Sequence, residues 1–110
     1  MYKLSISPEA KDDLVKIKSN ISKERCNTHA AVNLVTKITR KIRGLTEHPE
    51  IGAPLSSVLD IQTDFRFLVC NNYLIFYRLE NRTIYVSRIL YSRRNYMRIL
   101  FGKLSEDEEI

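Results

Sequence analysis

The chain has 110 residues, which gives room for one domain and for no second hydrophobic core. A hydrophobic content of 44% and a charged content of 28% are those of an ordinary globular domain. The formal net charge of +5 permits nucleic acid, an acidic protein or an anionic surface as a partner, and it selects none of these classes.

The lengths of the apolar runs and the number of cysteines indicate the cellular compartment. No apolar run approaches the length of a membrane span, and Met1 to Ser7 is too short and too polar for the apolar part of a signal peptide. Cys26 and Cys70 are the only cysteines, and they lack the paired spacing of a metal site. We therefore expect a cytoplasmic protein with free thiols, no metal, no cofactor and no membrane partner.

The first part of the chain predicts a strand followed by a helix. Apolar and polar residues alternate from Tyr2 to Ser7, which is the period of a half-buried strand. Ser7 then supplies an N-cap ahead of Pro8 and Glu9, which both suit a first helical turn. The apolar stripe of this helix consists of Ala10, Leu14, Ile17 and Ile21. Its solvated residues are expected to be Asp12, Asp13, Lys16 and Lys18.

A second amphipathic helix follows a polar break from Ser22 to Thr28. Its apolar stripe is Ala31, Leu34, Val35, Ile38, Ile42 and Leu45, and its outer face carries Lys37, Arg40, Lys41 and Arg43. The two helices predict a helical hairpin whose apolar stripes need a sheet to cover. The next segment, Glu47 to Asp64, is expected to be irregular because Pro49, Gly52 and Pro54 break any helix.

Three apolar runs then predict an antiparallel meander of strands, which are Phe65 to Cys70, Tyr73 to Leu79 and Thr83 to Leu90. Asn71 and Asn72 suit a tight turn between the first two strands, and residues 80–82 mark the next turn. A two-residue turn places Arg66 opposite Tyr77 on one face of the sheet. A bulge or a slip of one residue would place Arg66 on the other face, so the register stays open.

The end of the chain predicts a short helix and a tail. Ser92 is a candidate cap for a helix from Arg93 to about Leu100. We expect one domain over residues 1–103, followed by an acidic, disordered tail over 104–110. The fold class is α+β, with the N-terminal strand and helical hairpin packed on a twisted antiparallel sheet that ends in a short C-terminal helix.

Positive charge gathers in the second half of the chain. Residues 65–103 contain eight basic residues, and Glu80 is the only acid among them. An arginine inside a strand is costly unless its stem packs and its guanidinium reaches water or an anion. A sheet with several arginines therefore predicts a negatively charged partner.

Four segments resemble the RelE/ParE superfamily of bacterial toxins, over about Tyr2 to Phe101. They are ISPEAKDDL (Ile6 to Leu14), LTEHPEIGAPL (Leu45 to Leu55), DFRFLVCNNYLIFYRL (Asp64 to Leu79) and VSRILYSRRNYMRIL (Val86 to Leu100). The resemblance implies the toxin of a type II toxin–antitoxin pair, which arrests growth until a cognate antitoxin protein binds it in a hetero-oligomer. Antitoxins of this kind usually wrap an acidic segment around the toxin.

The superfamily has two branches with different targets. One branch cuts messenger RNA on the ribosome, and the other poisons DNA gyrase without catalytic residues of its own. The ending ILYSRRNYMRIL is more similar to the gyrase-poisoning, ParE-like branch, in which Asn95 would replace an acid. A ParE-like gyrase inhibitor is thus the leading expectation, and a RelE-like ribosome-dependent mRNA endonuclease is the alternative. A basic RNA- or protein-binding module without toxicity is a third.

The resemblance also implies site residues. If the chain is a nuclease, its catalytic candidates are Arg66, Arg94 and Tyr96, because RNA cleavage requires proton transfer and cations at the phosphate. The target- or antitoxin-binding candidates are Arg66, Arg78, Arg88, Arg93, Arg94 and Arg98. Arg66 can instead lie along the sheet with its stem packed, and Arg78 and Arg88 can be solvated strand residues or cross-strand partners of a tyrosine. Arg93 and Arg94 have a weaker structural alternative, because a positive charge at a helix start opposes the helix dipole.

Overall fold

The computed structural model describes residues 1–24 and 27–101. Expectations for Cys26 and for the tail over 104–110 fall outside these residues. Within them, no helix is both long enough and apolar enough to cross a membrane.

The first strand and helix form where the sequence predicts them. Strand β1 spans Lys3–Ile6 and helix α1 spans Pro8–Glu24. The backbone N–H of Ala10 donates to Ser7 Oγ at 3.0 Å, which confirms the predicted N-cap. The predicted break at Ser22 is wrong, because α1 continues to Glu24. Serine and lysine are polar but compatible with a helix interior, and neither glycine nor proline interrupts the helix there.

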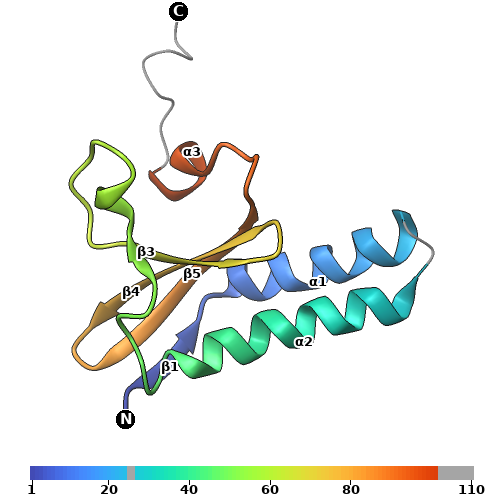
Figure 1. Ribbon diagram of the computed structural model, residues 1–110, viewed down its shortest axis with the longest axis horizontal. Coiled ribbons are helices and arrows are strands. Elements are labelled where there is room, and N and C mark those ends of the chain that lie inside the picture. Colours follow the sequence, from blue (N-terminus) through green and yellow to red (C-terminus); the bar gives the residue numbers. More distant parts are fainter. Residues whose placement is uncertain (25–26, 102–110) are drawn as a thin grey trace, which may run out of the picture.

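Helix α2 spans Thr28–Gly44 and returns alongside α1 (Figure 1). Asn27 is the N-cap of α2, and its Oδ1 accepts a hydrogen bond of 3.0 Å from the N–H of Ala30. The predicted stripe is confirmed by the buried residues of α2, which are Ala31, Leu34, Ile38 and Ile42. The helical hairpin therefore presents an apolar surface to the sheet.

The sheet has the strand order β1-β5-β4-β3-β2. Strands β3 (Arg66–Cys70), β4 (Tyr73–Glu80) and β5 (Thr83–Tyr91) form the predicted antiparallel meander. Positive φ angles at Asn71, Asn81 and Arg82 close its two tight turns. Strand β1 joins β5 in parallel, so the sheet is mixed where an antiparallel sheet was expected. The helical hairpin between β1 and the meander is long enough for this crossover.

A two-residue strand, β2 (Ala53–Pro54), was not predicted and pairs with the edge of β3. Proline normally interrupts secondary structure, but an edge strand tolerates it because the side of the strand that faces away from the sheet needs no N–H donor. A short 3-10 helix, η1 (Leu55–Ser57), follows and buries Leu55. The segment predicted as irregular thus adds the fifth strand.

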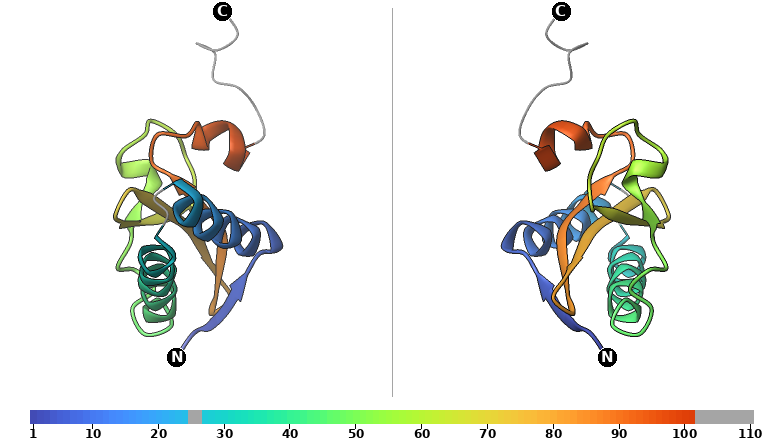
Figure 2. Two further views of the ribbon diagram at one scale, coloured as in Figure 1. Left: turned by 90° about the vertical axis from the view of Figure 1, so that its right-hand side faces the viewer. Right: turned by 90° about the vertical axis from the view of Figure 1, so that its left-hand side faces the viewer.

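Two apolar clusters lie on the two faces of the sheet. The larger one, between the sheet and the hairpin, includes Ile38, Ile42, Ile75, Tyr77 and Ile84. On the other face, Leu55 of η1 packs with Phe76 and Leu90 of the sheet. Helix α3 (Tyr96–Phe101) packs against this cluster and lies on the side away from the hairpin (Figure 2). Both faces of the central strands are therefore covered.

Helix α3 begins later than predicted. A helix start at Arg93 was expected, but the N–H of Arg94 donates to the carbonyl of Tyr91 at 3.0 Å and closes a turn there. Asn95 precedes the helix, and its Oδ1 accepts a bond of 3.3 Å from the N–H of Arg98. Arg93 and Arg94 therefore lie in the turn before α3, not inside a helical first turn.

Candidate functional site

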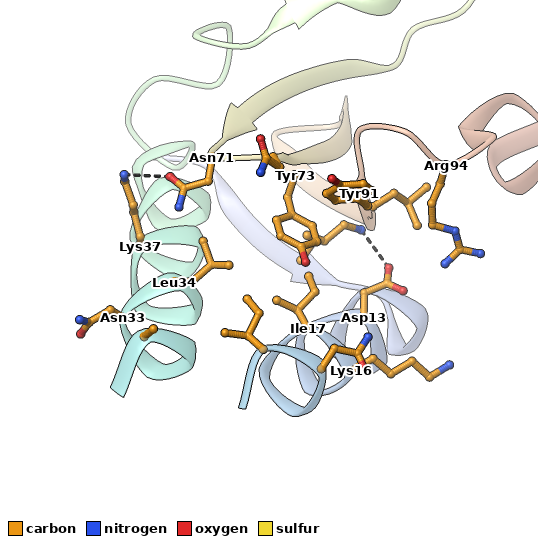
Figure 3. Close-up of a pocket in the computed structure, with 16 residues that line it drawn as sticks. Asp13, Lys16, Ile17, Asn33, Leu34, Lys37, Asn71, Tyr73, Tyr91 and Arg94 are labelled. Carbon is orange, nitrogen blue, oxygen red and sulfur yellow. Dashed lines mark hydrogen bonds between the residues drawn. The ribbon is translucent and has the colours of Figure 1, made fainter. Parts of the chain in front are cut away.

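An open groove of about 740 Å³ lies between the helical hairpin and the ends of β4 and β5 (Figure 3). Its apolar floor includes Ile17 from α1, Leu34 from α2 and Ile89 from β5. Both helices and the sheet contribute because α1 and α2 turn their apolar stripes toward the strands. The groove is thus built from the elements that form the larger core.

An ion pair at the groove joins α1 to β5. The guanidinium of Arg88 donates from Nε to Asp13 Oδ2 and from Nη2 to Asp13 Oδ1, both at 2.8 Å. The backbone N–H of Ile89 donates to Asp13 Oδ2 at 2.9 Å. The hydrogen bond to Asp13 raises the pKa of Arg88 above its ordinary value. The expectation that Asp13 is solvated is wrong, since its exposed fraction is only 7%.

Two tyrosines form one wall of the groove. The rings of Tyr73 and Tyr91 meet edge to face, with centroids 5.6 Å apart and planes inclined by 67°. Strand register places them opposite each other at the paired ends of β4 and β5. Such a pair presents rigid, amphipathic surface to a partner.

Three cationic side chains, Lys16, Lys37 and Arg94, lie at the rim of the groove around its apolar floor. Lys16 Nζ lies 2.9 Å from Asp12 Oδ2, and both side chains are well exposed. Lys37 Nζ donates to Asn71 Oδ1 at 3.0 Å, and Arg94 lies exposed at the far side of the groove. An apolar floor with a cationic rim complements a peptide that carries both apolar and acidic side chains.

Arg66 lies on the hairpin face of the sheet, opposite Tyr77, as the two-residue turn predicts. Its Nε donates to the carbonyl of Gly52 at 3.0 Å, and its Nη2 donates to the carbonyl of Glu50 at 3.1 Å. The hydroxyl of Tyr77 bonds the same turn, donating to the carbonyl of Pro49 at 2.7 Å and accepting from the N–H of Gly52 at 3.0 Å. Arg66 and Tyr77 together fasten the 49–52 turn to the sheet.

Other arginines of the meander also have contacts within the molecule. Arg78 Nη1 lies 3.7 Å from Asp64 Oδ2 and 3.8 Å from Glu80 Oε2, and its guanidinium sits 5.7 Å from the ring centroid of Phe65. Arg82 lies 5.0 Å from the ring centroid of Tyr2. Much of the positive charge predicted to face a partner is therefore engaged inside the fold.

The structure does not bring the three catalytic candidates into one cluster. Tyr96 packs on Phe76, with ring centroids 5.2 Å apart, on the face away from the hairpin. Arg66 lies on the opposite face, and Arg94 lines the groove. The remaining binding candidates, Arg93 and Arg98, are exposed around α3.

Sequence reasoning missed several groove residues. Asp13 lies three residues after Ala10 and four before Ile17, which places it on the buried side of α1. That spacing was the available signal for its burial. Tyr73, Tyr91 and Lys37 carried no comparable signal, because only the fold brings strand ends and helices together. Within the described residues, no group of three or more histidine, cysteine or acidic side chains is arranged to hold a metal.

Comparisons with known proteins agree with this architecture. A family model described as the ParE toxin of the type II toxin-antitoxin system parDE matches residues 4–96. A solved structure titled "Chromosomal ParDE TA system from P. aeruginosa" superposes with a TM-score of 0.70 at 20% sequence identity, covering 83% of this chain and 96% of that one. That likeness concerns the fold alone. Among curated proteins, no significant match was found.

Proposed function

Because the chain belongs to the ParE toxin family of type II toxin–antitoxin systems, we propose that it arrests growth by inhibiting DNA gyrase and that a cognate antitoxin neutralises it. The observation that carries this proposal is the family match, which extends over residues 4–96 and thus over the groove and the sheet. Gyrase is proposed as the target because it is the target of the ParE-like branch, and contacts within the chain support this choice.

The placement of the catalytic candidates favours an inhibitor over a nuclease. General acid–base catalysis requires its groups to lie within hydrogen-bond reach of one reacting centre. Arg66 and Tyr96 lie on opposite faces of the sheet, and Arg66 is held by two carbonyl groups. This separation supports a toxin that acts by binding, as expected for the gyrase-poisoning branch.

The groove is the proposed antitoxin site. An antitoxin segment with apolar side chains would cover Ile17, Leu34 and Ile89, and its carboxylates would face Lys16 and Arg94. Burial of the apolar floor would supply affinity, whereas the rim charges would set orientation and association rate. The antitoxin would thus bridge the hairpin and the sheet.

A supercoiling assay with purified gyrase tests the target. We expect the purified chain to inhibit supercoiling, and we expect prior addition of the antitoxin to restore it. A parallel cell-free translation reaction on one defined message, mapped by primer extension, tests the nuclease alternative. Cuts that appear only with ribosomes present, together with unaffected supercoiling, would contradict the gyrase proposal.

A further inference from the structure

Helix α2 carries four positive charges and no negative one. It contains no aspartate or glutamate, and its four cationic residues are Lys37, Arg40, Lys41 and Arg43. Helix α1, of equal length, has four acids, which are matched by four lysines. The two helices have equal length, but their net charges are +4 for α2 and zero for α1.

These four cations, which we call the α2 band, remain outside the ion pairs of the fold. All four side chains are exposed, and none takes part in an ion pair among the described residues. Lys37 makes a hydrogen bond, but its acceptor is the neutral amide oxygen of Asn71. By contrast, Arg78 and Arg88 of the sheet face carboxylates. Helix α2 therefore carries a group of four cations that no carboxylate of the described residues balances.

The spacing of the band follows the helix. Ile38 and Ile42 lie between the cations in the sequence and are buried, whereas the cations are exposed, so the band lies on the solvent side of the C-terminal half of α2. From Lys37 to Arg43 the helix axis advances by about 9 Å. Duplex DNA presents roughly five phosphate charges over that length of its own axis. Stabilisation of the helix C-terminus accounts for Lys41 and Arg43 in the last turn, but Lys37 and Arg40 precede it.

The composition of the band favours a nucleic-acid backbone over a protein. The exposed residues of 36–44 other than the cations are Thr36 and Gly44. Protein interfaces are anchored by buried aromatic or large apolar residues, and single-stranded nucleic acid is held by stacking on aromatic rings. Phosphate contacts require only cations and small polar groups. We propose that the α2 band binds the phosphate backbone of duplex DNA without reading its sequence.

Fluorescence anisotropy with the purified full chain and a labelled duplex of about 20 base pairs tests this proposal. With four phosphate contacts, raising the salt from about 50 to 200 mM should weaken binding roughly a hundredfold. The variant Arg40→Gln/Arg43→Gln should weaken binding at least tenfold at the lower salt and should reduce the salt slope by about 2. The control Lys11→Gln/Lys18→Gln removes the same charge from exposed positions of α1 and should change affinity less than threefold.

Three results would overturn the proposal. Equal weakening by both double variants would indicate attraction by net charge alone. Equal affinity for duplex RNA would remove the assignment to DNA. Loss of antitoxin affinity in the α2 variant, without measurable DNA binding by the parent chain, would assign the band to the antitoxin. The anisotropy assay contains no gyrase, so its result does not depend on whether the chain inhibits gyrase.

Discussion

The carboxylate of Asp13 and the guanidinium of Arg88 form a two-point ion pair that joins the middle of α1 to β5. Both hydrogen bonds measure 2.8 Å, and the N–H of Ile89 adds a third to the same carboxylate. Strand β1 pairs with β5 only as far as Val86, so it offers no acceptor to the N–H of Ile89. Asp13 supplies that acceptor. The pair therefore secures the helix where the strand ladder stops.

Asp13→Asn should lower the free energy of unfolding by about 2–4 kcal/mol, because it leaves Arg88 without its counter-charge in a largely buried setting. Urea denaturation measures this loss. Asp12→Asn removes an exposed pair with Lys16 and should cost less than about 1 kcal/mol. The raised pKa of Arg88 adds stability that is fully present below its unfolded-state pKa and is lost only at strongly alkaline pH. Equal unfolding midpoints for the two variants would contradict the structural role of Asp13.

Gly52→Ala should destabilise the fold by about 1–3 kcal/mol through overpacking. A Cβ at this position would lie 2.6 Å from Tyr77 Oη and 2.7 Å from the carbonyl oxygen of Phe67, and the latter is backbone. Gly44→Ala is the matched control, because a Cβ there meets nothing within 4 Å and lies at the end of α2. The control should be neutral or stabilising by up to about 1 kcal/mol. Thermal unfolding compares the two, and a neutral Gly52→Ala would contradict the close approach.

The elements of the fold were predictable where local pattern decides them. The alternation of Tyr2 to Ser7, the stripes of both helices and the asparagine turn of the meander each specify local structure, and each is confirmed. The pairing of β1 with β5 was not predictable, because parallel neighbours are chosen by tertiary packing across a long crossover. Strand β2 was missed because two residues are too short to show a period.

The candidate site was less predictable than the fold. Arginine counts along the meander indicated a positive sheet, but sequence alone does not show which arginines find partners inside the molecule. Arg88 finds Asp13, which is 75 residues away in the chain, and Arg66 finds carbonyl groups of a distant turn. Ion pairs of this kind balance part of the charge of the sheet, whereas the four cations of α2, which the sequence showed only as an outer helix face, form no ion pair among the described residues.

Arg94→Glu should weaken antitoxin binding at least tenfold, because it reverses a rim charge of the groove. Most of the loss should appear in the association rate and in its salt dependence, which surface plasmon resonance resolves. Arg98→Glu makes the same change at the exposed position of α3, outside the groove, and serves as the control. Equal losses for both variants would contradict the placement of the antitoxin in the groove.

Arg93→Ala/Arg94→Ala should relieve growth arrest when the chain is expressed without antitoxin. Both side chains are exposed in the turn before α3, so their removal should leave the fold intact and should weaken contact with an anionic target. Growth curves after induction provide the readout, and circular dichroism of the purified variant confirms folding. Unchanged toxicity of a folded double variant would remove these arginines from the proposed target surface.

Tyr96→Phe separates the two toxic mechanisms. The substitution keeps the aromatic ring that packs on Phe76 and removes only the hydroxyl, so the cover over the outer face should remain. A gyrase inhibitor should keep its toxicity within about twofold, whereas a nuclease that uses this phenol for proton transfer should lose about 10²-fold or more in cleavage rate. Supercoiling inhibition and primer extension on the same preparation measure both activities. If a folded Tyr96→Phe variant no longer arrests growth and no longer cleaves messenger RNA on the ribosome, the chain is a nuclease and the gyrase proposal is wrong.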